Sequence, residues 1–217
     1  LVVSELRDRV GADTIPALAA LAARVGAAAI LVCAPIDDRA VGDVFALAVS
    51  AAMARAGLVL DGVDDLAAAV RGALAGRYAP SAALPVLERI AELVPRELRA
   101  FLLLAAARSA PGFTVARGSA LLGVTRRTLE RRLARAGFPR ASRIIQWCTA
   151  LRVAWRLDVL GQRPSDVRAA LGFASRSAMS NVVRRHGGRS ATALRLHGAF
   201  AAMRERFAAE LAVHQGG

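Results

Sequence analysis

Two stretches of this sequence share one layout: Thr114-Val-Ala-Arg-Gly-Ser-Ala-Leu-Leu-Gly-Val-Thr-Arg-Arg-Thr-Leu-Glu-Arg-Arg-Leu133 and Pro164-Ser-Asp-Val-Arg-Ala-Ala-Leu-Gly-Phe-Ala-Ser-Arg-Ser-Ala-Met-Ser-Asn-Val-Val183. Each has a short apolar helix, then a glycine (Gly123 or Gly172) that permits a tight turn. A hydroxyl residue follows, Thr125 or Ser175, which can accept a hydrogen bond from a free amide at the start of a second helix. The layout is typical of a helix-turn-helix unit, and the sequence contains it twice.

The second helix of each unit carries the side chains expected to meet DNA. We predict these helices over Thr125–Ala136 and Ser175–His186. In a helix-turn-helix the first turns of the second helix face the major groove, and residues three or four apart share one face. The candidate DNA-binding residues are Thr125, Arg126, Arg127, Glu130, Arg131, Ser175, Arg176, Ser177, Ser180, Asn181, Arg184 and Arg185.

The chemistry of the candidates suggests different roles. Arg127 and Arg131 can each bond two acceptors on guanine, and Asn181 suits adenine. Glu130 can accept from cytosine or support a neighbouring arginine; the plainer alternative is an ion pair within its own helix. Arg184 and Arg185 lie farther along the second helix and are better placed for phosphates. For Arg132 and Arg135 we expect solvated charges or general attraction to phosphate.

The distribution of charge favours nucleic acid as a partner. All 30 basic residues are arginine, and the formal net charge is +13. Residues 1–100 hold 10 arginines and 12 acidic residues, whereas residues 101–217 hold 20 arginines and 5 acidic residues. A high-GC genome explains arginine in place of lysine, but it does not explain this segregation of sign. A cationic half of a chain binds phosphates with salt-dependent affinity.

A long apolar helix is predicted between the two units, over Ser142–Leu160. Its apolar residues recur at helical spacing, and Trp147 and Trp155 among them are expected in the core. Such a helix would fix the separation of the two units, so that both can enter successive major grooves.

The N-terminal part is predicted to be α/β. Strand-like runs at Leu1–Ser4, Ala28–Ala34 and Gly57–Leu60 alternate with helical patterns, and continuous apolar strands of this kind indicate a parallel sheet. The expected domains are an α/β module (1–75), a connector with an amphipathic helix (76–94), an all-α double helix-turn-helix domain (95–197) and a helical tail (198–217).

Residues 95–197 resemble the DNA-binding domain of the AraC/XylS family of transcription regulators. The resemblance rests on Leu122–Leu133 and Ala170–Ser177 and on their separation, and it implies seven helices with two helix-turn-helix units. The chain departs from the family at four positions that usually hold aromatics: Met179, Val183, Gly187 and Leu194. These smaller residues predict a thinner core behind the second recognition helix.

Residues 1–75 resemble the last three βα units of a response-regulator receiver domain, in element order and spacing. Leu1 lies inside an apolar run, so we expect further strands upstream. The family's phosphoacceptor position falls at Ser4 or Glu5, its switch hydroxyl at Cys33 and its lysine at Asp61. None of these supplies the receiver chemistry, so no phosphoacceptor is expected, and the module is interpreted as a degenerate receiver that serves assembly or signal input.

Other functional classes find little support. No nucleophile motif, metal-spaced His/Cys cluster or phosphate-binding glycine loop is present, so no enzyme activity, metal or cofactor is expected. No stretch is typical of a membrane span, and a cytoplasmic protein is expected. The expected partner is double-stranded DNA. The N-terminal module or the connector helix is a candidate homodimer surface, and RNA polymerase is a further candidate partner.

Three hypotheses follow. The leading one is a sequence-specific transcription regulator. The second is a protein-interaction scaffold or anti-regulator that has kept the fold and lost specific DNA binding, motivated by the thinner second core. The third is a phosphorylation-dependent regulator, which would need an acidic pocket supplied by strands upstream.

Overall fold

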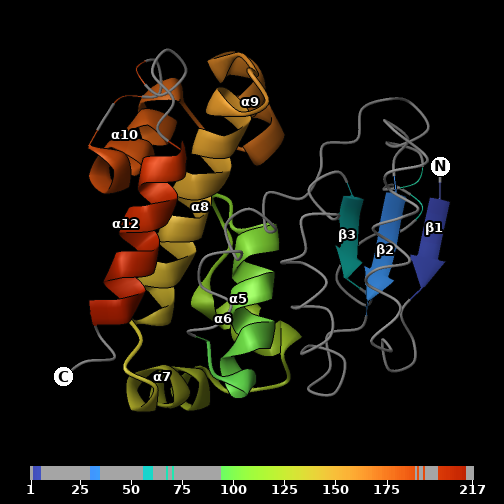
Figure 1. Cartoon of the computed structure of the whole chain (residues 1–217), viewed down its shortest axis with the longest axis vertical. Coiled ribbons are helices and arrows are strands. Elements are labelled where there is room, and N and C mark those ends of the chain that lie inside the picture. The colour runs from blue at the N-terminus through green and yellow to red at the C-terminus, as the bar shows by residue number, and fades with distance from the viewer. Residues whose placement is uncertain are drawn as a thin grey trace. The chain divides into compact units, whose positions relative to one another are not determined.

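The computed structural model describes residues 2–5, 30–34, 56–60, 67, 70, 94–188, 190, 193 and 200–213 (Figure 1). The chain divides into two compact units, Leu1–Leu103 and Leu104–Gly217, and the division falls inside a helix. The boundaries expected at residues 75 and 94 stay predictions.

The described N-terminal elements are three parallel strands, β1 (Val2–Glu5), β2 (Ile30–Ala34) and β3 (Ala56–Leu60), in the order β1-β2-β3. Each lies at a predicted apolar run, and Glu5 pairs in register with Cys33. Apolar side chains on both faces of such strands suit a parallel sheet. The helices predicted between the strands, most of the predicted helix 63–75, Asp61 and the connector helix 82–94 lie outside the described residues.

Residues 94–188 and 200–213 contain seven helices and no strand. They are α5 (Arg96–Arg108), α6 (Val115–Leu121), α7 (Arg126–Arg135), α8 (Ala141–Asp158), α9 (Pro164–Leu171), α10 (Arg176–Gly187) and α12 (Phe200–Val213). The expected all-α character of this part is confirmed. With its two capping residues, α7 covers the predicted range Thr125–Ala136. Helix α10 begins after the predicted cap Ser175 and ends at Gly187, one residue beyond the predicted end at His186.

Helix α8 is the centre of this part of the chain. It packs against α6, α7, α9, α10 and α12, so most of its surface is covered. Trp147 and Trp155 are both buried, as predicted from the apolar spacing. With 18 residues, α8 is about 27 Å long. Both helix-turn-helix units are therefore built on one continuous element.

Helix α12 belongs to the same core, whereas the sequence analysis assigned residues 198–217 to a tail. Its buried side chains come at helical spacing and pack on α8 and α10: Phe200, Met203, Phe207 and Leu211. The Phe200 amide also donates to Asp158 Oδ2 at 2.9 Å, which joins the start of α12 to the end of α8. The tail interpretation missed this apolar stripe.

Within the part of the chain that the structure describes, no helix combines the length and the apolar character needed to cross a membrane.

Candidate nucleic-acid interface

The first helix-turn-helix is formed by α6 and α7. Thr114 Oγ1 accepts from the Arg117 amide at 3.2 Å and begins α6. Gly123 turns the chain with φ of +63°, a conformation that L side chains rarely adopt. Thr125 Oγ1 then accepts from the Thr128 amide at 3.1 Å and begins α7. The Thr125 hydroxyl is thus occupied in capping while its residue stays exposed.

Helix α7 separates an apolar side from a cationic side. Leu129 and Leu133 are buried and hold the helix to the core. The side chains of Arg126, Arg127 and Arg131 are exposed. Because the buried residues are four apart and the arginines lie around the opposite side, the cations predicted to meet DNA face solvent.

Glu130 has a role that the sequence did not predict. Its Oε2 accepts from the amide of Ala141, the first residue of α8, at 3.3 Å. A carboxylate at a helix N-terminus satisfies a free amide and interacts favourably with the helix dipole. The side chain is half-buried. The structure therefore ties Glu130 to the junction between α7 and α8, in place of the ion pair with Arg126 or Arg127 that was the plainer expectation.

The second helix-turn-helix is formed by α9 and α10, with Gly172 as the C-cap of α9. Gly172 turns the chain with φ of +72°. Ser175 Oγ accepts from the Ala178 amide at 3.1 Å and caps α10. Among the other predicted DNA-binding residues of this unit, Ser180 is half-buried. The remaining ones are exposed: Arg176, Ser177, Asn181, Arg184 and Arg185.

Helix α12 contributes side chains behind α10, where the sequence predicted a thin core. Met179 and Val183 are both buried. A Cβ added to Gly187 would lie 2.8 Å from Met203 Sδ on α12, so the missing side chain makes room for this methionine. The helix ends at Gly188, whose φ of +69° suits a C-terminal cap. Leu194 lies outside the described residues.

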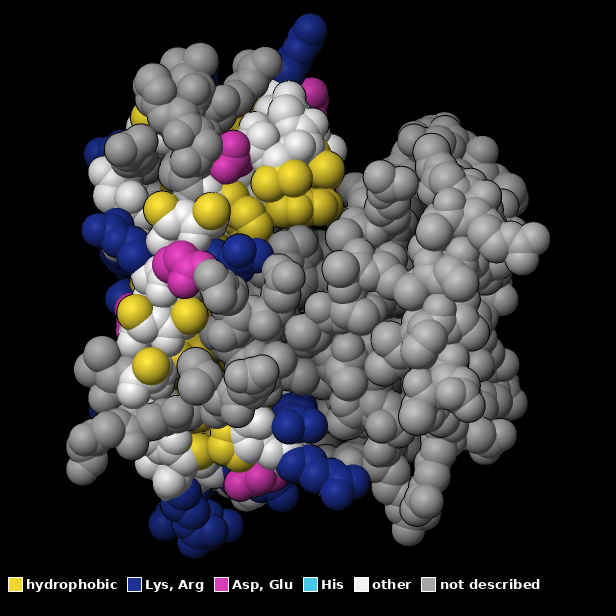
Figure 2. All heavy atoms as spheres, viewed as in Figure 1, with side chains coloured by type: hydrophobic (Ala, Val, Ile, Leu, Met, Phe, Trp, Pro, Cys, Tyr) yellow, Lys and Arg dark blue, Asp and Glu magenta, His cyan; other side chains and the backbone are white. Residues whose placement is uncertain are grey.

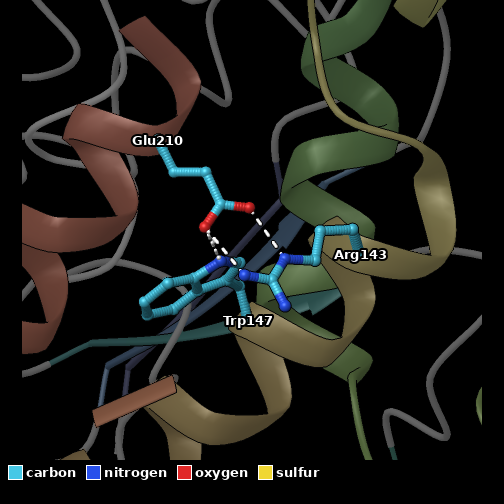
Figure 3. A network of polar contacts seen from close by, with 3 residues as sticks. All are labelled: Arg143, Trp147 and Glu210. Atoms are coloured by element: carbon cyan, nitrogen blue, oxygen red, sulfur yellow. Dashed lines mark hydrogen bonds and ion pairs between the residues drawn. The ribbon is translucent and has the colours of Figure 1, made fainter. Parts of the chain in front are cut away.

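A polar network of Arg143, Trp147 and Glu210 joins α8 to α12 (Figure 3). Arg143 donates to Glu210 through two nitrogens, Nε to Oε1 at 2.7 Å and Nη2 to Oε2 at 3.0 Å. Trp147 Nε1 donates to Glu210 Oε2 at 2.7 Å. One carboxylate thus accepts three hydrogen bonds, two of them in the paired geometry that favours arginine.

The ring of Trp147 connects this network to α10. Its centroid lies 4.5 Å from that of His186 and 5.5 Å from that of Phe207. Burial, with the charge of Arg143, lowers the pKa of His186 to about 4, so the imidazole is neutral at pH 7. The hydrogen bond from Arg143 holds the pKa of Glu210 below its usual value. The sequence analysis had placed Trp147 in the core but missed its partners, because they lie more than 35 residues away.

Helices α7 and α10 lie toward opposite ends of α8 (Figure 1). In the space-filling view, dark blue arginine side chains gather at the bottom edge, over α7, and along the left edge, beside α10 and α12 (Figure 2). The described part of the chain thus presents cations close to both units.

No protein-family model, curated protein or solved structure matches this chain. Its function must therefore be argued from the geometry of its own residues.

Proposed function

We propose that this protein is a sequence-specific regulator that binds duplex DNA through α7 and α10. One observation carries the proposal. Each of two helix-turn-helix units has a positive-φ glycine in its turn and a hydroxyl cap on its second helix, and each presents arginine and small polar side chains to solvent from the start of that helix. In such units these positions meet the base edges of the major groove.

The exposed side chains suit direct contact with bases. Arg127 and Arg131 can each donate twice to guanine, and the Asn181 amide can pair with adenine. Arg184 and Arg185 lie later on α10, where phosphates are the expected partners. Glu130 is proposed to position α7 against α8, because its carboxylate is already engaged with Ala141.

Helix α8 supports simultaneous binding by both units. Its length of about 27 Å is comparable with the distance of about 34 Å between successive major grooves on one face of DNA. Helix-turn-helix units built toward opposite ends of one helix could therefore occupy two grooves together.

The scaffold alternative loses its motive in this structure. It was based on a thin core behind α10, and the contact of Met203 with Gly187 supplies packing there that the sequence did not predict. The N-terminal module is proposed to serve assembly, including homodimerisation, or signal input without phosphoryl transfer at Glu5. Contact with RNA polymerase and a cytoplasmic location are parts of the same proposal.

Selection of bound sequences from random duplex DNA by the full chain tests the proposal. A site should emerge, and its affinity should fall steeply with salt. Failure to bind any duplex at low salt would overturn the proposal.

Single-base variants of the selected site would then separate the roles of individual residues. Arg131→Ala should relax the preference at one position by about 1–3 kcal/mol. Arg184→Ala should weaken all sequences alike and lower the salt slope by about one unit. Arg96→Ala removes an exposed charge from the start of α5 and is the matched control.

A further inference from the structure

Helix α12 brings a cation to the end of the second recognition helix. A Cβ built on Gly188, the C-cap of α10, would lie 3.7 Å from Nη1 of Arg206. The Gly188 amide donates to the carbonyl oxygen of Arg184 at 2.9 Å, so Gly188 lies one helical turn beyond Arg184. The guanidinium of Arg206 therefore lies at a point where α10 itself has no side chain.

The exposed face of α10 leads to this point. Four exposed residues are spaced by four, three and four positions, and so share one face: Ser177, Asn181, Arg184 and Gly188. The first two are proposed to meet base edges, and Arg184 is proposed to meet a phosphate. Because Arg206 lies beside Gly188, one turn farther along the same face, its position suits a further phosphate.

Arg206 is available to bind an anion. Its side chain is exposed. On its own helix, the acidic residue at ion-pairing spacing is Glu210, and both oxygens of that carboxylate already accept hydrogen bonds from Arg143 or Trp147. In the part of the chain that the structure describes, the Arg206 side chain makes no ion pair or hydrogen bond. Its donors are therefore left for a partner outside the chain.

We propose that Arg206 is a further DNA-binding residue, which donates to a phosphate beside the major groove that α10 enters. The inference rests on the proposed function, because it needs α10 in that groove. The planar guanidinium can donate twice to one phosphate group. Helix α10 contains no acidic residue, so it would not repel the phosphate. Helix α12 would then contribute to binding as well as to packing.

A structural role for Arg206 makes a different prediction. A cation near the last carbonyl groups of a helix stabilises that helix through its dipole. If this were its whole role, Arg206→Met would lower the Tm, and the folded variant would bind DNA with the salt dependence of the wild type. The salt dependence of binding therefore separates the two roles.

Titration of the selected duplex with the full chain at several salt concentrations is the first test. Arg206→Met should weaken binding about three- to tenfold at moderate salt and lower the salt slope by about one unit. Arg206→Lys keeps the positive charge and should retain most of the slope. Arg96→Met removes an exposed charge from α5 and should bind as the wild type does. Equal slopes for Arg206→Met and Arg96→Met would overturn the assignment.

Duplexes with one uncharged linkage locate the contact. Methylphosphonates, placed one at a time across the selected site, each remove one backbone charge. One of them, in the half of the site whose base preference Asn181→Ala relaxes, should weaken the wild type about as much as Arg206→Met does. It should weaken Arg206→Met no further.

Two outcomes count against the inference in different ways. If every methylphosphonate weakens the wild type and Arg206→Met equally, Arg206 contacts no phosphate, and this inference alone is overturned. If the full chain binds no duplex at low salt, the proposed function and this inference are both overturned.

Discussion

The two helix-turn-helix units each have a glycine turn and a hydroxyl cap but differ in what supports them. In the first, Leu129 and Leu133 are buried, and Glu130 reaches only as far as the start of the next helix. In the second, α10 rests on Trp147 of α8 and on a C-terminal helix that follows it in the chain. The first unit packs on α8, which follows it directly in the chain, whereas the second also needs α12 and the first half of α8. Identical local motifs can therefore have unequal requirements for folding.

Phe207→Ala should produce the largest separation between the units. Phe207 is fully buried on α12 and stacks on Trp147. Truncation of a buried phenylalanine costs about 3–5 kcal/mol. Urea unfolding would measure the loss, and amide exchange should rise more in α10 than in α7. Val159→Ala, at an exposed apolar position, should change stability by less than about 0.5 kcal/mol. Equal exchange in both recognition helices would refute the difference in support.

Glu210→Gln should have a smaller effect on the same unit. The amide keeps the shape of the side chain but cannot accept the paired hydrogen bonds of Arg143 as a carboxylate does. Because both side chains are partly exposed, we expect a loss of about 1–2 kcal/mol at pH 7. Denaturant titration of the variant, alone and combined with Arg143→Met, would measure the coupling between the two residues. Additive losses would contradict the network.

His186 should make stability depend on pH. Its pKa in the folded state, about 4, lies below the ordinary value of 6.5, so the unfolded chain takes up a proton first as the pH falls. Stability contributed by the neutral imidazole is present above pH 6.5 and declines towards pH 4. His186→Phe keeps a ring beside Trp147. In this variant the urea midpoint of unfolding should change less between pH 7 and pH 5 than in the wild type. If the urea midpoint of the variant depends on pH as steeply as that of the wild type, another group causes the pH dependence.

Gly187→Ala should give the smallest effect and the finest test of how α12 meets α10. Alanine favours the helix by up to about 1 kcal/mol over glycine, but its Cβ would lie 2.8 Å from Met203 Sδ. We expect a net loss of about 1 kcal/mol from overpacking. In the Met203→Ala background the same substitution should become stabilising. A double-mutant cycle without coupling would show that the two helices do not meet there.

The local features of the second half could be predicted from the sequence. A glycine followed within three residues by a hydroxyl residue marked both turns, and the apolar period located α8 with its two tryptophans. These signals are local because the amides they satisfy lie within one helical turn. Exposure of most candidate DNA-binding residues followed from the same period, whereas Glu130 and Ser180 are half-buried.

The long-range partners could not be predicted. Nothing within one helical turn of Glu210 indicates that its carboxylate meets Arg143 and Trp147, since the contact spans more than 60 residues. The buried stripe of α12 was present in the sequence at helical spacing, but it was assigned to a tail. Glu130 was expected to meet DNA or to pair within its own helix, and its hydrogen bond to the Ala141 amide at the start of α8 was not predicted.

The continuity of α8 limits how this protein could change the spacing of its two units. One residue inserted into α8 would advance everything beyond it by about 1.5 Å and turn it by about 100°. A loop between two units can change their separation without a fixed rotation. In a helix, each added residue changes both the separation and the relative rotation of the units. A change of spacing that keeps both recognition helices on one side is therefore restricted to additions of about three or four residues, close to a whole turn. The apolar side of α8 would then have to be rebuilt with it.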